Sequence, residues 1–392
     1  MPLRPPLSVA PRMADIAPFH VMELMQQAQA LEAAGRDIVH MEVGEPDFPT
    51  PAPIMDAAMA HLAGGHVHYT SALGLPALRE AIAAFYHSRY GVEVSPERIV
   101  VTAGASAALL LALGVLVAPG DEILLTDPGY PCNRHFVRLF EGVPVGLPVG
   151  AETNFQPTLE QVEAAWGPRT RGLMLASPAN PTGTLVDQAT LAALTQRVEQ
   201  KGGVLLMDEI YHGLTYGIEA STALALSERT LVVNSFSKYF NMTGWRLGWL
   251  VAPLELVRDI EKLAQNLFIS PPTPAQYGAL AAFRPETLAI TEARRREFQA
   301  RRDFLLAELP KLGFHLPVVP EGAFYVYADC SALSDDSFAL AARLINEAGV
   351  AVTPGLDFGS NAPEKHLRFA YTTSLVHLQE GVARMAKFFG NS

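Results

Sequence analysis

One lysine and one arginine stand in a stretch whose residue types suit chemistry on a phosphorylated aldehyde. The stretch, SFSKYFNMTGWRLGW at residues 235–249, places Lys238 just after the apolar run LVVNS and Arg246 eight residues later. A lysine in a tight, partly apolar turn beside another cation loses its proton more easily and becomes a nucleophile. Arg246, Ser235 and Ser237 offer a guanidinium and hydroxyls to a phosphate. The stretch predicts Schiff-base chemistry, although a lone lysine is more often found in a surface ion pair.

Three further polar residues follow other apolar runs. Asp208 ends GGVLLMD, Tyr211 comes three residues later, and Asn180 lies in SPANPTGT. A carboxylate at the mouth of a sheet suits a pyridine ring, because the acid keeps the ring nitrogen protonated while a phenol and an amide hold a phenolic oxygen. With an effective dielectric of ~20, an ion pair at contact contributes on the order of 4 kcal/mol. This set therefore favours a cationic, electron-withdrawing ring.

Two turns add weaker signals. Gly104, Ala105 and Ser106 form a small-residue turn before a long apolar helix, where free backbone N–H groups and the helix dipole favour an anion. Tyr130 follows another expected strand, in DPGYP, where the carboxyl edge of a parallel sheet places ligand-contacting groups. Small-residue turns are common in α/β proteins, so neither turn is specific by itself.

The elements that must position these residues alternate between strand and helix. Runs rich in Val, Leu and Ile recur between residues 99 and 251, each followed by a turn and, in most cases, a helix. This rhythm predicts an α/β fold with a mostly parallel sheet covered by helices on both faces. A charged amphipathic helix over 286–309 is long enough to bridge two domains. We expect a large domain over residues 46–285 and a smaller α+β domain formed by residues 1–45 and 286–392.

Composition limits the classes of function. The chain has 392 residues, 49% of them hydrophobic, with a net charge of −11 and a pI near 5.5, so it offers no basic surface for nucleic acid or an anionic membrane. The apolar run at 105–118 is too short to cross a bilayer. Two distant cysteines, Cys132 and Cys330, indicate neither a disulfide framework nor a metal site. With no signal-peptide pattern at the start, we expect a cytoplasmic protein.

Nine motifs follow one another along nearly the whole chain: GEPDF, YTSALGLPALR, TAGASAAL, DPGYP, SPANPTGT, MDEIY, SFSKYFNMTGWRLG, GAFYVYAD and LRFAYT. Together they closely resemble the class I/II aminotransferases of fold type I, the aspartate aminotransferase superfamily, which use pyridoxal 5'-phosphate. The resemblance implies transfer of an amino group from an L-amino acid to a 2-oxo acid by a ping-pong mechanism, in amino acid metabolism, through an internal aldimine on Lys238.

The resemblance also implies roles for individual residues. Lys238 carries the cofactor and shuttles the proton, Asp208 pairs with the ring nitrogen, and Tyr211 binds the ring oxygen. Tyr130 stacks on the ring. The phosphate cup consists of Gly104, Ala105, Ser106, Ser235, Ser237 and Arg246.

Other roles in the resemblance concern the substrate and a second subunit. Arg368 in LRFAY grips the substrate carboxylate, while Asn180, a partner of the ring oxygen, assists it near Gly44. Tyr69 reaches the phosphate of the neighbouring subunit's cofactor, which implies a homodimer with shared active sites.

Alternative functions share most of these motifs. A carbon–sulfur lyase or a cyclopropane-forming synthase uses the same fold and cofactor, and some regulators fuse the fold to a DNA-binding domain, for which this chain has no helix-turn-helix segment. One branch of aspartate aminotransferases has a lysine where this chain has Ser106. Its absence favours neutral, apolar or aromatic donors, with 2-oxoglutarate or pyruvate as acceptor.

Overall fold

The computed structural model describes residues 7–390, and its centre is a seven-stranded sheet in the order β2-β8-β7-β6-β5-β3-β4. All pairings are parallel except those of β8, which runs antiparallel to β2 and β7. The mostly parallel sheet predicted from the alternating pattern is therefore confirmed. Its strands are β2 Ile99–Thr102, β3 Glu122–Asp127, β4 Val143–Pro148, β5 Thr170–Ala176, β6 Val204–Asp208, β7 Leu231–Ser235 and β8 Gly248–Val251.

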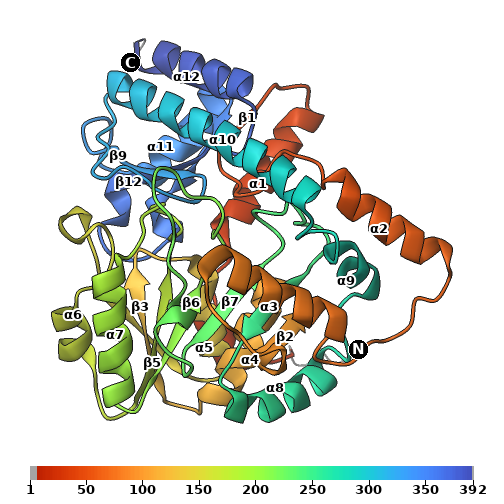
Figure 1. The fold of residues 1–392 in the computed structure, drawn as a ribbon. Helices are drawn as coiled ribbons and strands as arrows, with labels where there is room; N and C mark the ends of the chain where they lie inside the picture. The colour runs from red at the N-terminus through yellow and green to blue at the C-terminus, as the bar shows by residue number, and fades with distance from the viewer. Residues whose placement is uncertain (1–6, 391–392) are drawn as a thin grey trace, which may run out of the picture.

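Helices cover both faces of this sheet (Figure 1). Neighbouring residues of β7 show the division, because Val232 packs in one hydrophobic cluster and Val233 in another, as expected when successive side chains point to opposite faces. The Val233 face is covered by α4 Gly104–Leu116, α5 Pro131–Leu139 and α8 Leu254–Leu267. The Val232 face is covered by α3 Pro76–Tyr90, α6 Leu159–Ala165 and α7 Gln188–Gln200.

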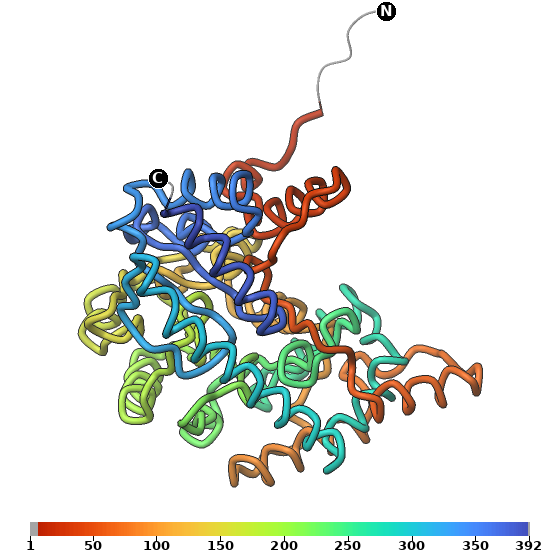
Figure 2. Tube along the Cα trace, turned by 90° about the horizontal axis from the view of Figure 1, so that it is seen from above, coloured from red at the N-terminus to blue at the C-terminus, as the bar shows by residue number. Residues whose placement is uncertain are grey.

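Two smaller sheets lie in the C-terminal part of the chain, and one of them also includes a strand from the N-terminal segment. Strand β1 (Val39–His40) pairs in parallel with β10 (Val350–Ala351), while β12 (His366–Ala370) lies between β11 (Thr353–Pro354) and β9 (Tyr325–Asp329) with antiparallel pairings. The helices of this part are α1 His20–Ala33, α10 Pro285–Glu308, α11 Ser337–Arg343 and α12 Leu375–Gly390. The N-terminal segment thus lies against the C-terminal part, as Figure 2 also shows. The domain boundaries at residues 46 and 286 stay a prediction.

One helix reaches away from the body of the molecule. In Figures 1 and 2, α2 (Ala52–Ala63) extends outward, and it packs along α9 (Thr273–Ala279). Its surface includes the exposed apolar side chains of Met55, Met59 and Leu62. Within residues 7–390, no helix combines the length and apolar character needed to cross a membrane, and no group of His, Cys, Asp or Glu side chains could hold a metal ion.

Candidate active site

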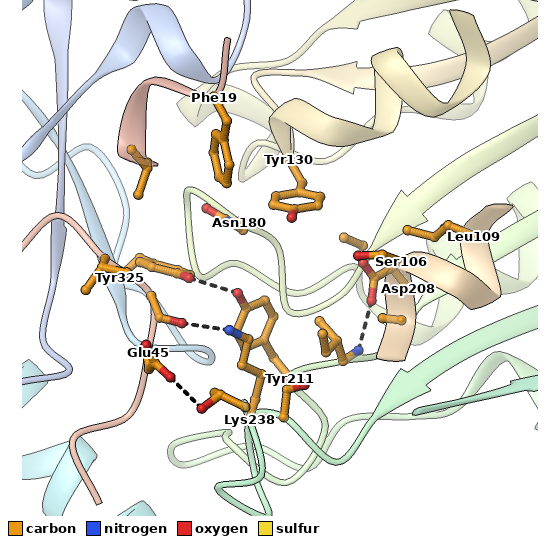
Figure 3. Close-up of a pocket in the computed structure, with 18 of the residues that line it drawn as sticks. Phe19, Glu45, Ser106, Leu109, Tyr130, Asn180, Asp208, Tyr211, Lys238 and Tyr325 are labelled. Atoms are coloured by element: carbon orange, nitrogen blue, oxygen red, sulfur yellow. Dashed lines mark hydrogen bonds between the residues drawn. The ribbon is translucent and has the colours of Figure 1, made fainter. Parts of the chain in front are cut away.

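A cavity of about 530 Å³ lies where the carboxyl ends of the central strands face the small sheets (Figure 3). Most of the residues singled out in the sequence line it: Gly44, Ala105, Ser106, Tyr130, Asn180, Asp208, Tyr211, Ser237, Lys238, Arg246 and Arg368. Gly104 and Ser235 are not part of the lining; Gly104 is the first residue of α4 and Ser235 the last residue of β7, next to residues that do line it. Tyr69 lies outside the cavity and is 79% exposed.

Lys238 and Asp208 reach the cavity from adjacent strands of the central sheet. Asp208 is the last residue of β6 and pairs with Val233 of β7, and Lys238 follows three residues after β7 ends. Lys238 Nζ donates a hydrogen bond to the Gly44 carbonyl at 2.7 Å. The pKa of Lys238 is lowered to about 8, chiefly by loss of contact with water and to a smaller extent by Arg368 and Arg246, while the carboxylates of Glu45 and Asp208 act in the opposite direction. A useful fraction of this amine is therefore neutral near pH 7.

Asp208 is a buried acid. Its side chain is almost inaccessible to solvent, and this desolvation raises its pKa to about 6, although the backbone N–H of Ile210 donates to Oδ1 at 3.0 Å. A carboxylate in such surroundings gains most from a cationic partner, because little water competes for it. The acid is thus suited to hold a protonated ring nitrogen.

Arg368 lies deeper, on β12. It is 2% exposed, donates to Asn180 Oδ1 at 2.9 Å and to the Glu42 carbonyl, and its guanidinium carbon lies 4.3 Å from the centre of the Tyr325 ring. Its Nε has no hydrogen-bond partner, and no carboxylate of residues 7–390 forms a salt bridge with it. A buried guanidinium without an anion is costly, so this position suits an anionic ligand.

At the opposite end of the cavity, the backbone at Gly104 lies close to the guanidinium of Arg246. Gly104 begins α4 with φ +80°, and a Cβ there would lie 2.6 Å from Arg246 Nη2. A Cβ on Gly248 would lie 2.9 Å from the backbone nitrogen of Ala105. The N-cap of α4, Ala103, supplies no side-chain hydrogen bond, so the first N–H groups remain for a ligand. These features fit a phosphate group.

The two serines of the stretch differ in position. Ser235 is 1% exposed, and its Oγ lies 3.0 Å from the Leu247 carbonyl and 2.8 Å from Ser237 Oγ. Ser237 lines the cavity, whereas Ser235 holds the turn that carries it. Both serines lie within three residues of Lys238 in the sequence.

Some residues of the cavity were not singled out from the sequence. They are Phe19, Val21, Met22, Val43, Glu45, Leu109, Ala176, Ile210, Thr243 and Tyr325. The Tyr325 hydroxyl lies 2.9 Å from that of Tyr211, and a Cβ on Gly44 would overlap it, which explains the glycine at that position. The GAFYVYAD motif contained a signal for Tyr325. The sequence contained no such signal for Phe19, Val21 and Met22, because a helical pattern does not tell which apolar residue faces a cavity.

Comparison with known proteins decides the family. The sequence profile described as aminotransferase class I and II matches residues 36–385. The chain belongs to the class I and II aminotransferase family. This family uses pyridoxal phosphate as cofactor.

Similar proteins match this aminotransferase over nearly its full length. It is 38% identical to the valine–pyruvate aminotransferase of Mycobacterium tuberculosis, with 96% of this chain and 97% of that protein covered. It is 36% identical to the aspartate/prephenate aminotransferase of Thermus thermophilus, with 97% and 98% covered. The crystal structure of an aminotransferase from Mycobacterium tuberculosis matches with a TM-score of 0.95 and 37% identity, over 99% of this chain and all of that one. The predicted fold type and the aminotransferase activity are therefore confirmed.

Proposed function

We propose that this aminotransferase holds pyridoxal phosphate in the cavity on Lys238 and transfers an amino group from an L-amino acid to a 2-oxo acid. The observation that carries the proposal is the position of Lys238 and Asp208 on adjacent strand ends, with an unpaired Arg368 across the same cavity. An amine, an acid for the ring and an anion binder for the substrate are then within one site.

The residues around the cavity fit each part of the cofactor. Gly104, Ala105, Ser106, Ser237 and Arg246 would hold the phosphate at the start of α4, with Ser235 behind them. Asp208 would hold the ring nitrogen, Asn180 and Tyr211 the ring oxygen, and Tyr130 the ring face. When bound, pyridoxal phosphate supplies an aldehyde that condenses with amines and a ring that takes up electrons from the substrate.

Lys238 has two tasks in this proposal. Its Nζ must be neutral to join the aldehyde, and the lowered pKa of about 8 keeps part of it neutral near pH 7. With the cofactor and substrate bound, the free Nζ of Lys238 would take the proton from the substrate Cα as a general base. The Gly44 carbonyl, 2.7 Å from Nζ, accepts a hydrogen bond that orients the side chain.

Arg368 binds the α-carboxylate that every donor and acceptor shares. Its planar fork matches a carboxylate with two parallel hydrogen bonds, and Asn180 and the Glu42 carbonyl fix its orientation. The backbone at Gly44 lies beside this position. One carboxylate site then serves both halves of a ping-pong reaction.

A homodimer completes the proposal. Tyr69 does not line its own cavity and is 79% exposed, which suits a residue that reaches a neighbouring subunit's phosphate. The exposed apolar side chains of α2, Met55, Met59 and Leu62, offer a surface for association. Both cysteines, Cys132 and Cys330, are free, which suits a reducing cytoplasm.

The test is a Lys238→Ala variant beside a Lys262→Ala control. We expect Lys238→Ala to lose transamination, and borohydride treatment of the wild type loaded with pyridoxal phosphate to leave the cofactor mass on Lys238. Lys262 is a surface residue, so its variant should retain both properties. Transamination by Lys238→Ala near the wild-type rate would refute the proposal. Release of pyruvate and ammonia from cystathionine without any acceptor would identify the carbon–sulfur lyase instead.

A further inference from the structure

We propose that the ion pair of Arg301 and Asp47 positions the reactive side chains of the cavity. It holds residues 42–47 where the carbonyl groups of this segment orient Lys238 and Arg368. Neither member of the pair lines the cavity, so both are positioning residues. The inference rests on the proposed function, because it concerns the same site, and it adds two residues that act on the site from outside.

The segment of residues 42–47 contacts two side chains of the site through its backbone. The Glu42 carbonyl accepts a hydrogen bond from Arg368, the proposed binder of the α-carboxylate. The Gly44 carbonyl accepts one from Nζ of Lys238, the proposed base, at 2.7 Å. A displacement of the segment would therefore move the partners of both side chains at once.

The two ends of this segment are held differently. Before it, the chain belongs to β1, and the backbone N–H of Met41 still donates to the Ala351 carbonyl at 2.9 Å. After it, the chain forms no strand or helix until α2 begins at Ala52. At this end the Asp47 carboxylate accepts two hydrogen bonds from Arg301, from Nη1 to Oδ1 at 2.8 Å and from Nη2 to Oδ2 at 3.1 Å. Such a bidentate pair fixes orientation as well as distance.

Arg301 is almost completely enclosed by protein. It is 1% exposed, and its guanidinium carbon lies 4.9 Å from the centre of the Phe48 ring and 5.2 Å from that of Phe298. Its Nη1 also donates to the Thr372 carbonyl at 2.8 Å, and its Nη2 donates to Glu297. Because little water competes for these groups, their hydrogen bonds are stronger than they would be at the surface.

The same arginine joins the segment to the strand that carries Arg368. The Thr372 carbonyl, two residues beyond the end of β12, accepts both from Arg301 Nη1 and from the backbone N–H of Asp47 at 3.2 Å. The Thr372 hydroxyl donates to the Val43 carbonyl at 2.8 Å. Arg301, on α10, therefore lies where this helix, the segment and the end of β12 meet.

The next residue of α10 offers a matched control. Arg302 is also buried, at 9% exposed, and pairs with Asp303 at 2.7 Å, while its other partners are the Pro320 carbonyl and the Tyr216 ring. None of these residues belongs to the segment. Arg302→Lys and Asp303→Ala thus change the same kinds of group on the same helix without touching residues 42–47. Every variant forms the same assembly, so what a neighbouring subunit adds to the cavity cancels in the comparison.

The first measurement follows the ionisation of Lys238 in the cofactor-free protein by trace acetylation at different pH values. All variants carry Glu45→Gln as well, so that movement of the Glu45 carboxylate does not mask the effect of water. Burial is the largest cause of the lowered pKa of Lys238. We expect Arg301→Lys and Asp47→Ala to admit water and raise the labelling midpoint by at least about half a pH unit, and the two control variants to leave it unchanged.

The second measurement is the affinity of the enzyme, loaded with pyridoxal phosphate, for 4-methylpentanoate, which has the shared carboxylate but no amine. Calorimetry should find binding about tenfold weaker in Arg301→Lys and Asp47→Ala, because the support of Arg368 shifts. The loss stays at this level because the hydroxyls of Thr243 and Thr372 still hold the segment. The control variants should bind as the wild type does.

The outcomes distinguish this inference from the proposed function. A loaded wild type that reacts with no amino-acid donor would overturn the proposed function, whatever the labelling comparison gives. Unchanged midpoints and affinities in Arg301→Lys and Asp47→Ala, or equal changes in the controls, would overturn the positioning role alone. A lower melting temperature without a change in either readout would show a purely structural role. If Arg301→Lys does not fold, Asp47→Ala tests the same contact from its more exposed side, where the side chain is 33% exposed.

Discussion

The reactivity of Lys238 offers a direct test of how the fold prepares the site. Its pKa is lowered from 10.5 to about 8, chiefly because protein atoms replace water around Nζ. At pH 7 the neutral fraction of the amine would then be about 1 in 10, compared with about 1 in 3,000 for an ordinary lysine. The structure therefore predicts that Lys238 is about 300-fold richer in its reactive form at neutral pH.

Trace acetylation of the cofactor-free protein, followed by peptide mass spectrometry, measures this fraction as a function of pH. Labelling of Lys238 should rise with a midpoint near pH 8, and the exposed Lys262 serves as an internal reference for the reagent. Glu45→Gln removes a carboxylate that raises the pKa of Lys238, while its amide oxygen can still accept from Thr243 Oγ1. The midpoint in this variant should move to lower pH.

Two results would refute this reasoning. A wild-type midpoint above pH 10 would mean that water reaches Nζ freely, so that burial does not lower the pKa of Lys238. A shift of Glu45→Gln toward higher pH would mean that the carboxylate does not act on Nζ through its charge.

Three further changes test two other residues of the site and one ion pair outside it. Arg368→Lys should raise KM for all amino-acid donors by about 30- to 100-fold, because an ammonium cannot form the paired hydrogen bonds of a guanidinium; steady-state kinetics beside an unchanged cofactor affinity would check this. Gly104→Ala, with φ +80° and a Cβ 2.6 Å from Arg246 Nη2, should weaken cofactor binding at least about tenfold in a fluorescence titration, and unaltered affinity would contradict the close-approach explanation. His40 has a pKa raised to about 9, mainly by its hydrogen bond with the buried Glu42. Because the folded-state pKa lies above the ordinary value of 6.5, the stabilisation is complete below pH 6.5 and is lost as the pH rises through 9. His40→Gln should thus cost about 1–2 kcal/mol of unfolding free energy at pH 6.5, after allowance for solvent screening, and almost nothing at pH 9.5 in urea titrations; equal costs at both pH values would exclude the ion pair as the cause.

The fold class and the strand-end residues could be predicted from the sequence. Apolar runs ending in Asp208 and in the turn before Lys238 predict parallel strands, and the carboxyl ends of such strands meet at one edge of a sheet. Local pattern is enough for this, because strand periodicity and turn residues act over a few neighbours. The amphipathic helix expected over 286–309 is observed as α10, Pro285–Glu308, for the same reason.

Only the tertiary structure decided what surrounds those residues. The pairing of β1 with β10 brings the chain near Glu42 and Gly44 between Arg368 and Lys238, and a hydrogen bond from His20 N–H to Asp357 Oδ1 ties the start of α1 to the C-terminal part. These contacts join segments hundreds of residues apart, so no local pattern encodes them. The lowered pKa of Lys238 is likewise a property of enclosure, because desolvation depends on every segment that excludes water and not on the residues adjacent in sequence.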